Sequence, residues 1–275
     1  MSPVNRHGFV FIINLTKDIE KKNHMYKLCR EYGLDPIFVR AVEGQRLELG
    51  RSIGVYSKDA AISGVGRELS ASEIGCSLSH KKIYQELVDG GIEKALILED
   101  DVEFDDDLLA VLNRIEGFPK DWEVVLLGHH AGGSRNKTTL ASMWGQKCLV
   151  GNSRLVRPCE VARGTYGYLI NQKGARKLIE ATYELVKPID HYTGDSAYTN
   201  LYAINPPVIH IHEELSTEYS SMNGREALQG AMNEGEYSWK KRLAIRWKIY
   251  SFLTLIRLYF VGGYGRIKPI RKYSS

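Results

Sequence analysis

The sequence has few cysteines, and their placement limits the protein's class. The four cysteines are far apart and show no Cys-x-x-Cys spacing; they are Cys29, Cys76, Cys148 and Cys159. Neither a disulfide framework nor a four-ligand zinc site is indicated, so reduced thiols are expected.

Long apolar runs are also absent near the start of the chain. The first seven residues have no apolar signal core, and the run over 9–13 is too short to cross a bilayer. We therefore expect the protein to stay in the compartment where it is made, which the thiols suggest is the cytoplasm.

The composition is that of an ordinary globular protein, but the charge is unevenly distributed. Of 275 residues, 43% are hydrophobic and 25% are charged, enough for one sizeable core with an appendage. Ten of the 37 Lys and Arg residues lie in 239–275 with no Asp or Glu, leaving 27 basic against 33 acidic residues in 1–238. We expect an acidic domain over 1–237 and a basic tail over 238–275.

The tail mixes basic residues with aromatic and aliphatic ones. Between Arg246 and Phe260 this mixture suits an amphipathic helix on an anionic membrane surface, and Arg257 interrupts an apolar stretch too short to span. The alternative is a helix docked on the core with a solvated basic face. Nucleic-acid binding is disfavoured because the aromatics accompany aliphatic residues.

Strand and helix patterns alternate along the domain, which is typical of an α/β sheet. A continuous apolar run over 8–14 suits a central parallel strand, a helix follows over 18–32, and 37–40 is the next strand. The glycine-rich stretch 43–69 is expected to be irregular. At 70–73 the Ser-x-x-Glu spacing predicts a capped helix that runs to about Val88 and stops at Gly90.

The next apolar run, 95–98, ends in three adjacent carboxylates: Glu99, Asp100 and Asp101. Open α/β sheets bind ligands at the carboxyl ends of their strands, and adjacent carboxylates there need a cation. Mg²⁺ or Mn²⁺ with a nucleotide diphosphate would supply it. The alternative is an exposed acidic turn, since more acidic residues follow over 103–107.

Several motifs occur in an order that resembles glycosyltransferase family 25, the lipopolysaccharide and lipooligosaccharide sugar transferases related to collagen galactosyltransferases. The segments that carry the resemblance are 11–15, 40–44, 69–80, 97–102, 167–175 and 188–190, within a match over roughly 8–215. Glu43 and the Lys21-Lys22 pair depart from the family pattern, which usually has Asp and Arg there.

The resemblance implies a GT-A-like sheet with helices on both faces and an inverting transfer, commonly of galactose from UDP-galactose. Asn14 and Leu15 resemble the family's nucleotide-facing turn. Glu99 and Asp100 resemble the donor motif, with Asp101 expected to bind the metal directly.

Glu73 and His80 resemble the helix motif beside the donor site. Cys76 lies on the same helix face, so Cys76 and His80 form a Cys-x-x-x-His pair. Two ligands do not make a zinc site, and packing is the alternative role.

A transferase also needs a base for the acceptor hydroxyl. Asp190, in the matched Pro-x-Asp, is the preferred base and Asp195 is the reserve; a helix cap is the alternative role for Asp190. His210 and His212 alternate along a strand-like segment, and His212 is expected to complete the metal shell. An edge-strand polar pair is the alternative.

Two other functions are compatible with this pattern. One is a sugar nucleotidyltransferase, although no Gly-rich loop with Arg and Lys follows the first strand. The other is a non-catalytic, membrane-associated saccharide-binding protein. A transferase releases UDP from a nucleotide sugar, a nucleotidyltransferase releases pyrophosphate, and a binding protein releases neither.

The tail generates a prediction about the membrane. Each basic residue near an anionic surface contributes about 1 kcal/mol, so a few engaged residues give salt-sensitive attachment on the cytoplasmic face, where a lipid-linked saccharide acceptor would be displayed. A chain cut after Tyr237 should fold and bind donor but no longer sediment with anionic vesicles. If the full chain ignores such vesicles at low salt, or if the cut chain unfolds, the tail is a docked structural helix.

Overall fold

The computed structural model describes residues 9–47, 55–131, 139, 141–142, 147–150 and 153–216. The tail predicted over 238–275 lies outside these residues. None of the helices within them is both long and apolar enough to cross a membrane.

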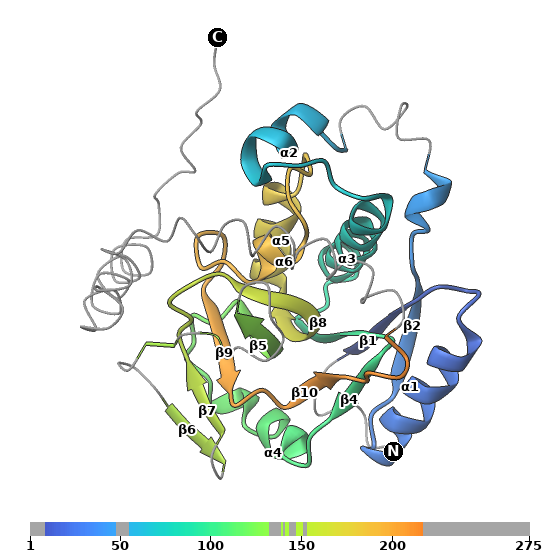
Figure 1. Ribbon diagram of the computed structural model, residues 1–275. Coiled ribbons are helices and arrows are strands. Elements are labelled where there is room, and N and C mark those ends of the chain that lie inside the picture. Colours follow the sequence, from blue (N-terminus) through green and yellow to red (C-terminus); the bar gives the residue numbers. More distant parts are fainter. Residues whose placement is uncertain are drawn as a thin grey trace.

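The domain is built on an eight-stranded mixed sheet in the order β2-β1-β3-β8-β5-β9-β7-β6 (Figure 1). Its strands are β1 (Phe9–Asn14), β2 (Pro36–Arg40), β3 (Lys94–Glu99), β5 (Val124–Ala131), β6 (Lys147–Val150), β7 (Ser153–Val156), β8 (Ala162–Asn171) and β9 (Leu201–Asn205). Because β1 is parallel to both β2 and β3, their carboxyl ends meet at one edge of the sheet. The α/β prediction is confirmed, with two additions: β8 runs antiparallel between β3 and β5, and β7 runs antiparallel between β9 and β6.

Helices cover both faces of the sheet (Figure 1). The first face packs against α2 (Lys58–Val65), α3 (Ala71–Asp89), α5 (Gln172–Ala181) and α6 (Asp190–Thr193). The second packs against α1 (Ile19–Glu31), α4 (Leu108–Leu112) and a two-stranded sheet of β4 (Val102–Phe104) and β10 (Ile209–Ile211). Short 3-10 turns occur at η1 (Gly44–Arg46) and η2 (Ile115–Gly117). Alternate residues of β1 and β3 enter the two cores, which explains their continuous apolar runs.

The predicted start of α3 is confirmed in detail. Ser70 accepts a hydrogen bond from the Glu73 amide, and the Glu73 carboxylate accepts one from the Ser70 amide. The expectation of irregular structure over 43–69 is wrong for 58–65, which forms α2. Ser57 caps that helix and Gly66 ends it in a left-handed conformation, so local signals for it were present.

Two glycine contacts bring distant segments into place around the carboxyl ends of β1 to β3. Gly75 of α3 lies against the backbone of Val42 and Gly44, where an added Cβ would stand 2.5 Å from the Val42 carbonyl oxygen. On the other face, β10 crosses β5 and β8 at Gly128 and Gly167, where an added Cβ would meet Ile209 at 2.8 and 2.7 Å. Both approaches depend on the absence of a side chain.

The contact at Gly75 predicts a stability difference between two glycine substitutions. Gly75→Ala should lower the free energy of unfolding by about 1–3 kcal/mol, because its new methyl group meets backbone atoms that cannot rotate away. Gly64→Ala is the matched control: its nearest neighbour is 3.9 Å away and it lies in α2, so alanine should raise stability by up to about 1 kcal/mol. Urea unfolding measures both, and equal effects would contradict the proposed close contact.

Candidate active site

A pocket lies where β1, β2 and β3 end, beside the first half of α3. It is lined by Ile13, Leu15, Lys17, Asp18, Lys21, Ala41, Val42, Glu43, Gly44, Gln45, Ser72, Cys76, Ser79, His80, Glu99, Asp100 and Asp101. Parallel strands in α/β proteins place their ligands at this position. The lining holds five carboxylates against two lysines, so its charge favours cations.

Asn14 joins the end of β1 to the acidic end of β3. Its side-chain amide donates to Asp100 Oδ2 at 2.7 Å and to the Asp18 carbonyl oxygen at 3.1 Å. Its own carbonyl oxygen accepts from the Ala41 amide at 2.9 Å, which holds the end of β2 alongside. The buried Asn14 side chain and carbonyl therefore fix the start of α1, the loop after β2 and the carboxylate of Asp100.

Lys21 is a site residue that the sequence reasoning treated only as a departure from the family pattern. From the first turn of α1, its Nζ lies 3.4 Å from Asp100 Oδ1 and 3.3 Å from Asp101 Oδ2. Its position on the first turn of the helix after β1 was the signal that the sequence offered. The contact itself depends on how α1 packs beside the end of β3.

The electrostatics show that Lys21 alone does not neutralise the acidic strand end. Burial, followed by the charge of Glu99, raises the pKa of Asp101 to about 6 although Lys21 opposes the shift. Burial likewise raises the pKa of Asp100. For Lys21, burial acts to lower the pKa, but Asp101 and Asp100 outweigh it and the pKa is raised. Another cation or donor would stabilise the ionised pair.

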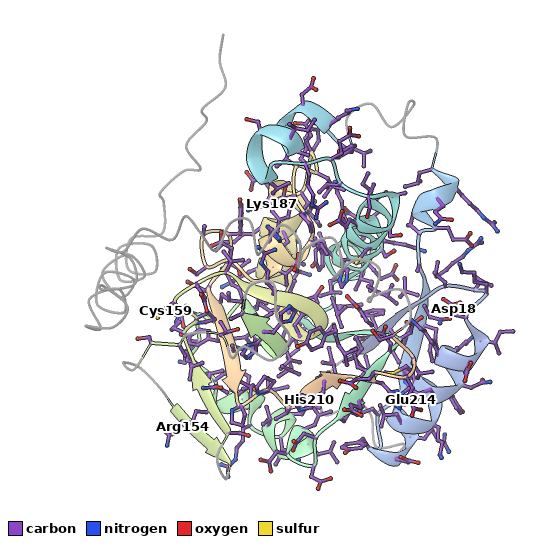
Figure 2. The ribbon with its side chains drawn as sticks, viewed as in Figure 1. Asp18, Arg154, Cys159, Lys187, His210 and Glu214 are labelled. Carbon is purple, nitrogen blue, oxygen red and sulfur yellow. The ribbon has the colours of Figure 1, made fainter. Side chains whose placement is uncertain are left out.

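His212, which follows β10, also contacts the acidic end of β3. Its backbone amide donates to the Asp101 carbonyl oxygen at 2.7 Å, and its ring packs edge-on against His24 with centroids 4.9 Å apart. Its Nδ1 is buried and has no hydrogen-bond partner. His210, labelled on β10 in Figure 2, is 45% exposed and lies 4.0 Å from Asp105, away from this cluster.

The first half of α3 forms one wall of the pocket. Ser79 Oγ accepts from the Val42 amide at 2.8 Å and so holds the loop after β2 against the helix. His80 is fully buried; its Nδ1 lies 2.8 Å from the Tyr168 hydroxyl and its Nε2 lies 3.7 Å from Glu99 Oε1.

Glu73 lies on the same helix but is not among the residues that line the pocket. Its carboxylate is held by Arg67 and the Ser70 amide, and these bonds lower its pKa despite the opposing effect of burial. The geometry gives Glu73 a role in anchoring α3. A direct contact with the donor stays a prediction.

Asp190 stands at the start of α6 and does not cap it. The cap residue is Ile189 and no side-chain cap bond is present, so the capping alternative is wrong. Asp190 Oδ2 instead accepts from the Gly164 amide at 3.5 Å. Burial, followed by the charges of Glu99 and Asp190, raises the pKa of the Cys76 thiol, but Asp190 is not among the residues that line the pocket.

Asp195, the reserve base, lies in the turn after α6. Its Oδ1 accepts from the Ala197 amide at 2.9 Å, a local bond that orders the turn. Asp195 therefore has a turn-forming contact, and the role of either aspartate as base stays a prediction.

Comparisons with known proteins identify the family of this chain and several relatives. The family model described as glycosyltransferase family 25 (LPS biosynthesis protein) matches residues 7–193. Procollagen galactosyltransferase 2 of Homo sapiens is 27% identical over 201 residues, which cover 68% of this chain and 30% of the relative. A glycosyltransferase 25 family member of Aedes aegypti is 32% identical over 194 residues, covering 66% of this chain and 30% of the relative. Some relatives are named inactive members of the family.

Among solved structures, a glycosyltransferase involved in glycosylation of the major capsid of PBCV-1 aligns with 64% of this chain and 64% of its own. Its identity is 10% and its TM-score is 0.31, too low to define a shared fold.

This chain spans about 30% of the length of the curated relatives it matches. The match nevertheless includes β1, α3, the acidic end of β3 and Asp190, which are the parts that build the pocket and its surroundings. The chain belongs to glycosyltransferase family 25.

Proposed function

We propose that this protein is an inverting galactosyltransferase with a GT-A-like fold. In this proposal it moves galactose from UDP-galactose to the saccharide part of a lipopolysaccharide or lipooligosaccharide acceptor. The observation that carries the proposal is the buried cluster of Asn14, Lys21, Asp100 and Asp101 at the ends of β1 and β3, inside a pocket of a family 25 chain.

The chemistry of the cluster fits a nucleotide diphosphate held through a divalent cation. Carboxylate oxygens are the preferred ligands of Mn²⁺ and Mg²⁺, and the raised pKa of Asp101 indicates that cation binding would relieve the cost of its charge. Asp101 would be the direct ligand, with His212, whose backbone amide donates to the Asp101 carbonyl oxygen, as the proposed nitrogen donor. When bound, the ion would neutralise negative charge on the leaving diphosphate.

Two lysines also favour binding of the diphosphate. Lys17 and Lys21 both line the pocket, so they supply positive charge close to the expected phosphate position. Leu15 lines the pocket after Asn14 and offers an apolar surface to the nucleoside. The donor is thus held by charge at the diphosphate and by packing beside it.

Asp190 is the proposed base for the acceptor. It accepts the proton of the acceptor hydroxyl while that oxygen bonds to the anomeric carbon and UDP leaves from the opposite face of the sugar. The Gly164 amide donates to Oδ2 of Asp190 and orients the carboxylate.

One observation also fits the nucleotidyltransferase alternative. The sequence shows no Gly-rich loop after β1, but Lys17 and Lys21 follow that strand in the pocket and could also face a triphosphate. Basic side chains therefore do not separate the two activities. The released product does, since a transferase liberates UDP and a nucleotidyltransferase liberates pyrophosphate.

A non-catalytic saccharide-binding protein is the remaining alternative, because some relatives are named inactive. Against it, this chain retains Glu99, Asp100, Asp101 and Asp190. Cytoplasmic location and attachment to an anionic membrane through residues 238–275 remain proposals that rest on sequence composition.

The first prediction concerns the cation. Turnover of UDP-galactose should be abolished by EDTA and restored by Mn²⁺. Because protonation of Asp101 competes with the ion and its pKa is raised to about 6, the apparent Mn²⁺ affinity should fall as the pH drops below 6, by up to about tenfold per pH unit. Calorimetric titration with Mn²⁺ in the presence of UDP measures this dependence. Full activity in EDTA would exclude the metal role.

A matched pair of variants assigns that effect to one carboxylate. Asp101→Asn should lose Mn²⁺-dependent UDP binding and keep a cooperative unfolding transition. Asp106→Asn, an exposed residue five positions further along, should behave as the unmodified protein. Equal losses in both variants would point to general electrostatics instead of a ligand at Asp101.

The second prediction concerns the base. Asp190→Asn should lower kcat by about a hundredfold or more with little change in donor binding, because the amide still fits but cannot accept the proton. Asp195→Asn is the control and should retain near-normal kcat. A normal rate in the first variant and a loss in the second would transfer the role to Asp195.

A further inference from the structure

Three side chains beside the acidic strand end converge in a way that the proposed mechanism does not use. Cys76 and His80 lie one turn apart on α3, and Glu99 ends β3 opposite them. Cys76 Sγ, a ring nitrogen of His80 and a carboxylate oxygen of Glu99 lie within 4.8 Å of one another. Donor atoms around one tetrahedral zinc ion, at 2.0–2.3 Å from it, are about 3.5 Å apart, so only small side-chain rotations separate this geometry from a coordinated one.

A chain of buried hydroxyl groups determines which nitrogen of His80 carries the proton. The Thr193 hydroxyl donates to the Ile189 carbonyl oxygen at 3.1 Å, so its oxygen must accept from the Tyr84 hydroxyl at 3.2 Å. The Tyr84 oxygen then accepts from the Tyr168 hydroxyl at 2.8 Å.

Because the Tyr168 hydroxyl donates its hydrogen bond to Tyr84, its oxygen accepts a hydrogen bond from His80 Nδ1 at 2.8 Å. Neutral His80 is thereby held with the proton on Nδ1 and a lone pair on Nε2. A hydrogen bond donated by the ring nitrogen that does not bind the metal typically fixes the tautomer of a metal-binding histidine.

The lone pair on Nε2 has no donor. Nε2 is fully buried, has no hydrogen-bond partner and lies 3.7 Å from Glu99 Oε1, which is also an acceptor. A buried acceptor that faces a carboxylate is unfavourable unless a cation lies between them.

The surrounding charge also favours a cation. Burial raises the pKa of the Cys76 thiol well above its ordinary value, and the charges of Glu99, Asp190, Glu73 and Asp101 add to the shift. Without a metal the thiol is therefore protonated. Coordination would release that proton and place a dipositive ion among these carboxylates.

We propose that Cys76 Sγ, His80 Nε2 and Glu99 bind a zinc-class divalent ion, with its fourth coordination position open to the pocket. A thiolate, an imidazole and a carboxylate form a set that zinc accepts and that Mn²⁺ and Mg²⁺ disfavour. All three residues line the pocket, so the open position faces the space beside Asp101. The suggestion that an oxygen of the nucleotide-sugar donor occupies this position rests on the proposed function. The ion site itself does not rest on it.

Cobalt is the probe, because thiolate coordination gives Co²⁺ an intense sulfur-to-metal charge-transfer absorption. The full chain, stripped with EDTA and freed of it, is titrated with Co²⁺ without nucleotide sugar. We expect one tightly bound equivalent with this absorption, bleached by equimolar Zn²⁺ and unaffected by the same amount of Mn²⁺.

Variants assign the ligands. Cys76→Ala should abolish the charge-transfer band, whereas Cys29→Ala, a matched loss of a buried thiol in the other core, should retain it. Tyr168→Phe leaves all three ligands in place but removes the acceptor for His80 Nδ1, so it should weaken Co²⁺ binding by about 10- to 100-fold while the band persists at saturation.

Three results would overturn the proposal: no thiolate band in the full chain, the same band in Cys76→Ala, or displacement of Co²⁺ by equimolar Mn²⁺. If Cys76→Ala does not fold, the full-chain titration and the Tyr168→Phe variant still test whether the zinc-class site exists. Since these titrations contain no donor, a failed zinc site and a failed transferase proposal are distinguished: the first leaves UDP release intact, and the second leaves the cobalt band intact.

Discussion

The site depends on the partial or complete burial of three consecutive carboxylates at the end of β3. Asp100 and Asp101 are buried directly after a strand whose side chains fill both cores, and Glu99, the last residue of that strand, is half-buried. Asn14 and Lys21 compensate part of their charge from β1 and α1. The remaining deficit raises the pKa of Asp101 to about 6, and a site that holds a diphosphate through a cation makes use of that deficit.

Close backbone contacts determine which side chains can reach these carboxylates. Gly75 lets α3 lie against the loop after β2, which brings Cys76 and His80 to one side of Glu99. Gly167 lets β10 cross the sheet, which brings the His212 amide to the Asp101 carbonyl oxygen. The glycines of the family motifs therefore have a steric reason to be glycine, independent of any contact with substrate.

Two kinds of cation chemistry lie side by side in this arrangement. The oxygen-rich side around Asp101 suits a hard ion that accompanies phosphate, whereas the Cys76 and His80 side suits a zinc-class ion. The hydroxyl chain from Thr193 through Tyr84 to Tyr168 sets the histidine tautomer from within the core. Substitution of a core tyrosine can consequently alter metal affinity without touching a ligand.

The sequence by itself indicated β1, β3, the start of α3 and the acidic end of β3, and it missed α2. Apolar runs marked β1 and β3, the Ser70–Glu73 pair marked the start of α3, and adjacent carboxylates marked the ligand edge, because these signals are local. Only the tertiary structure decided that Lys21 faces Asp100 and Asp101, that Glu73 anchors a helix through Arg67, and that Glu99 completes a triad with Cys76 and His80. Those outcomes depend on how α1 and α3 pack on the sheet, and the spacing of residues along one chain does not encode distances between separate elements.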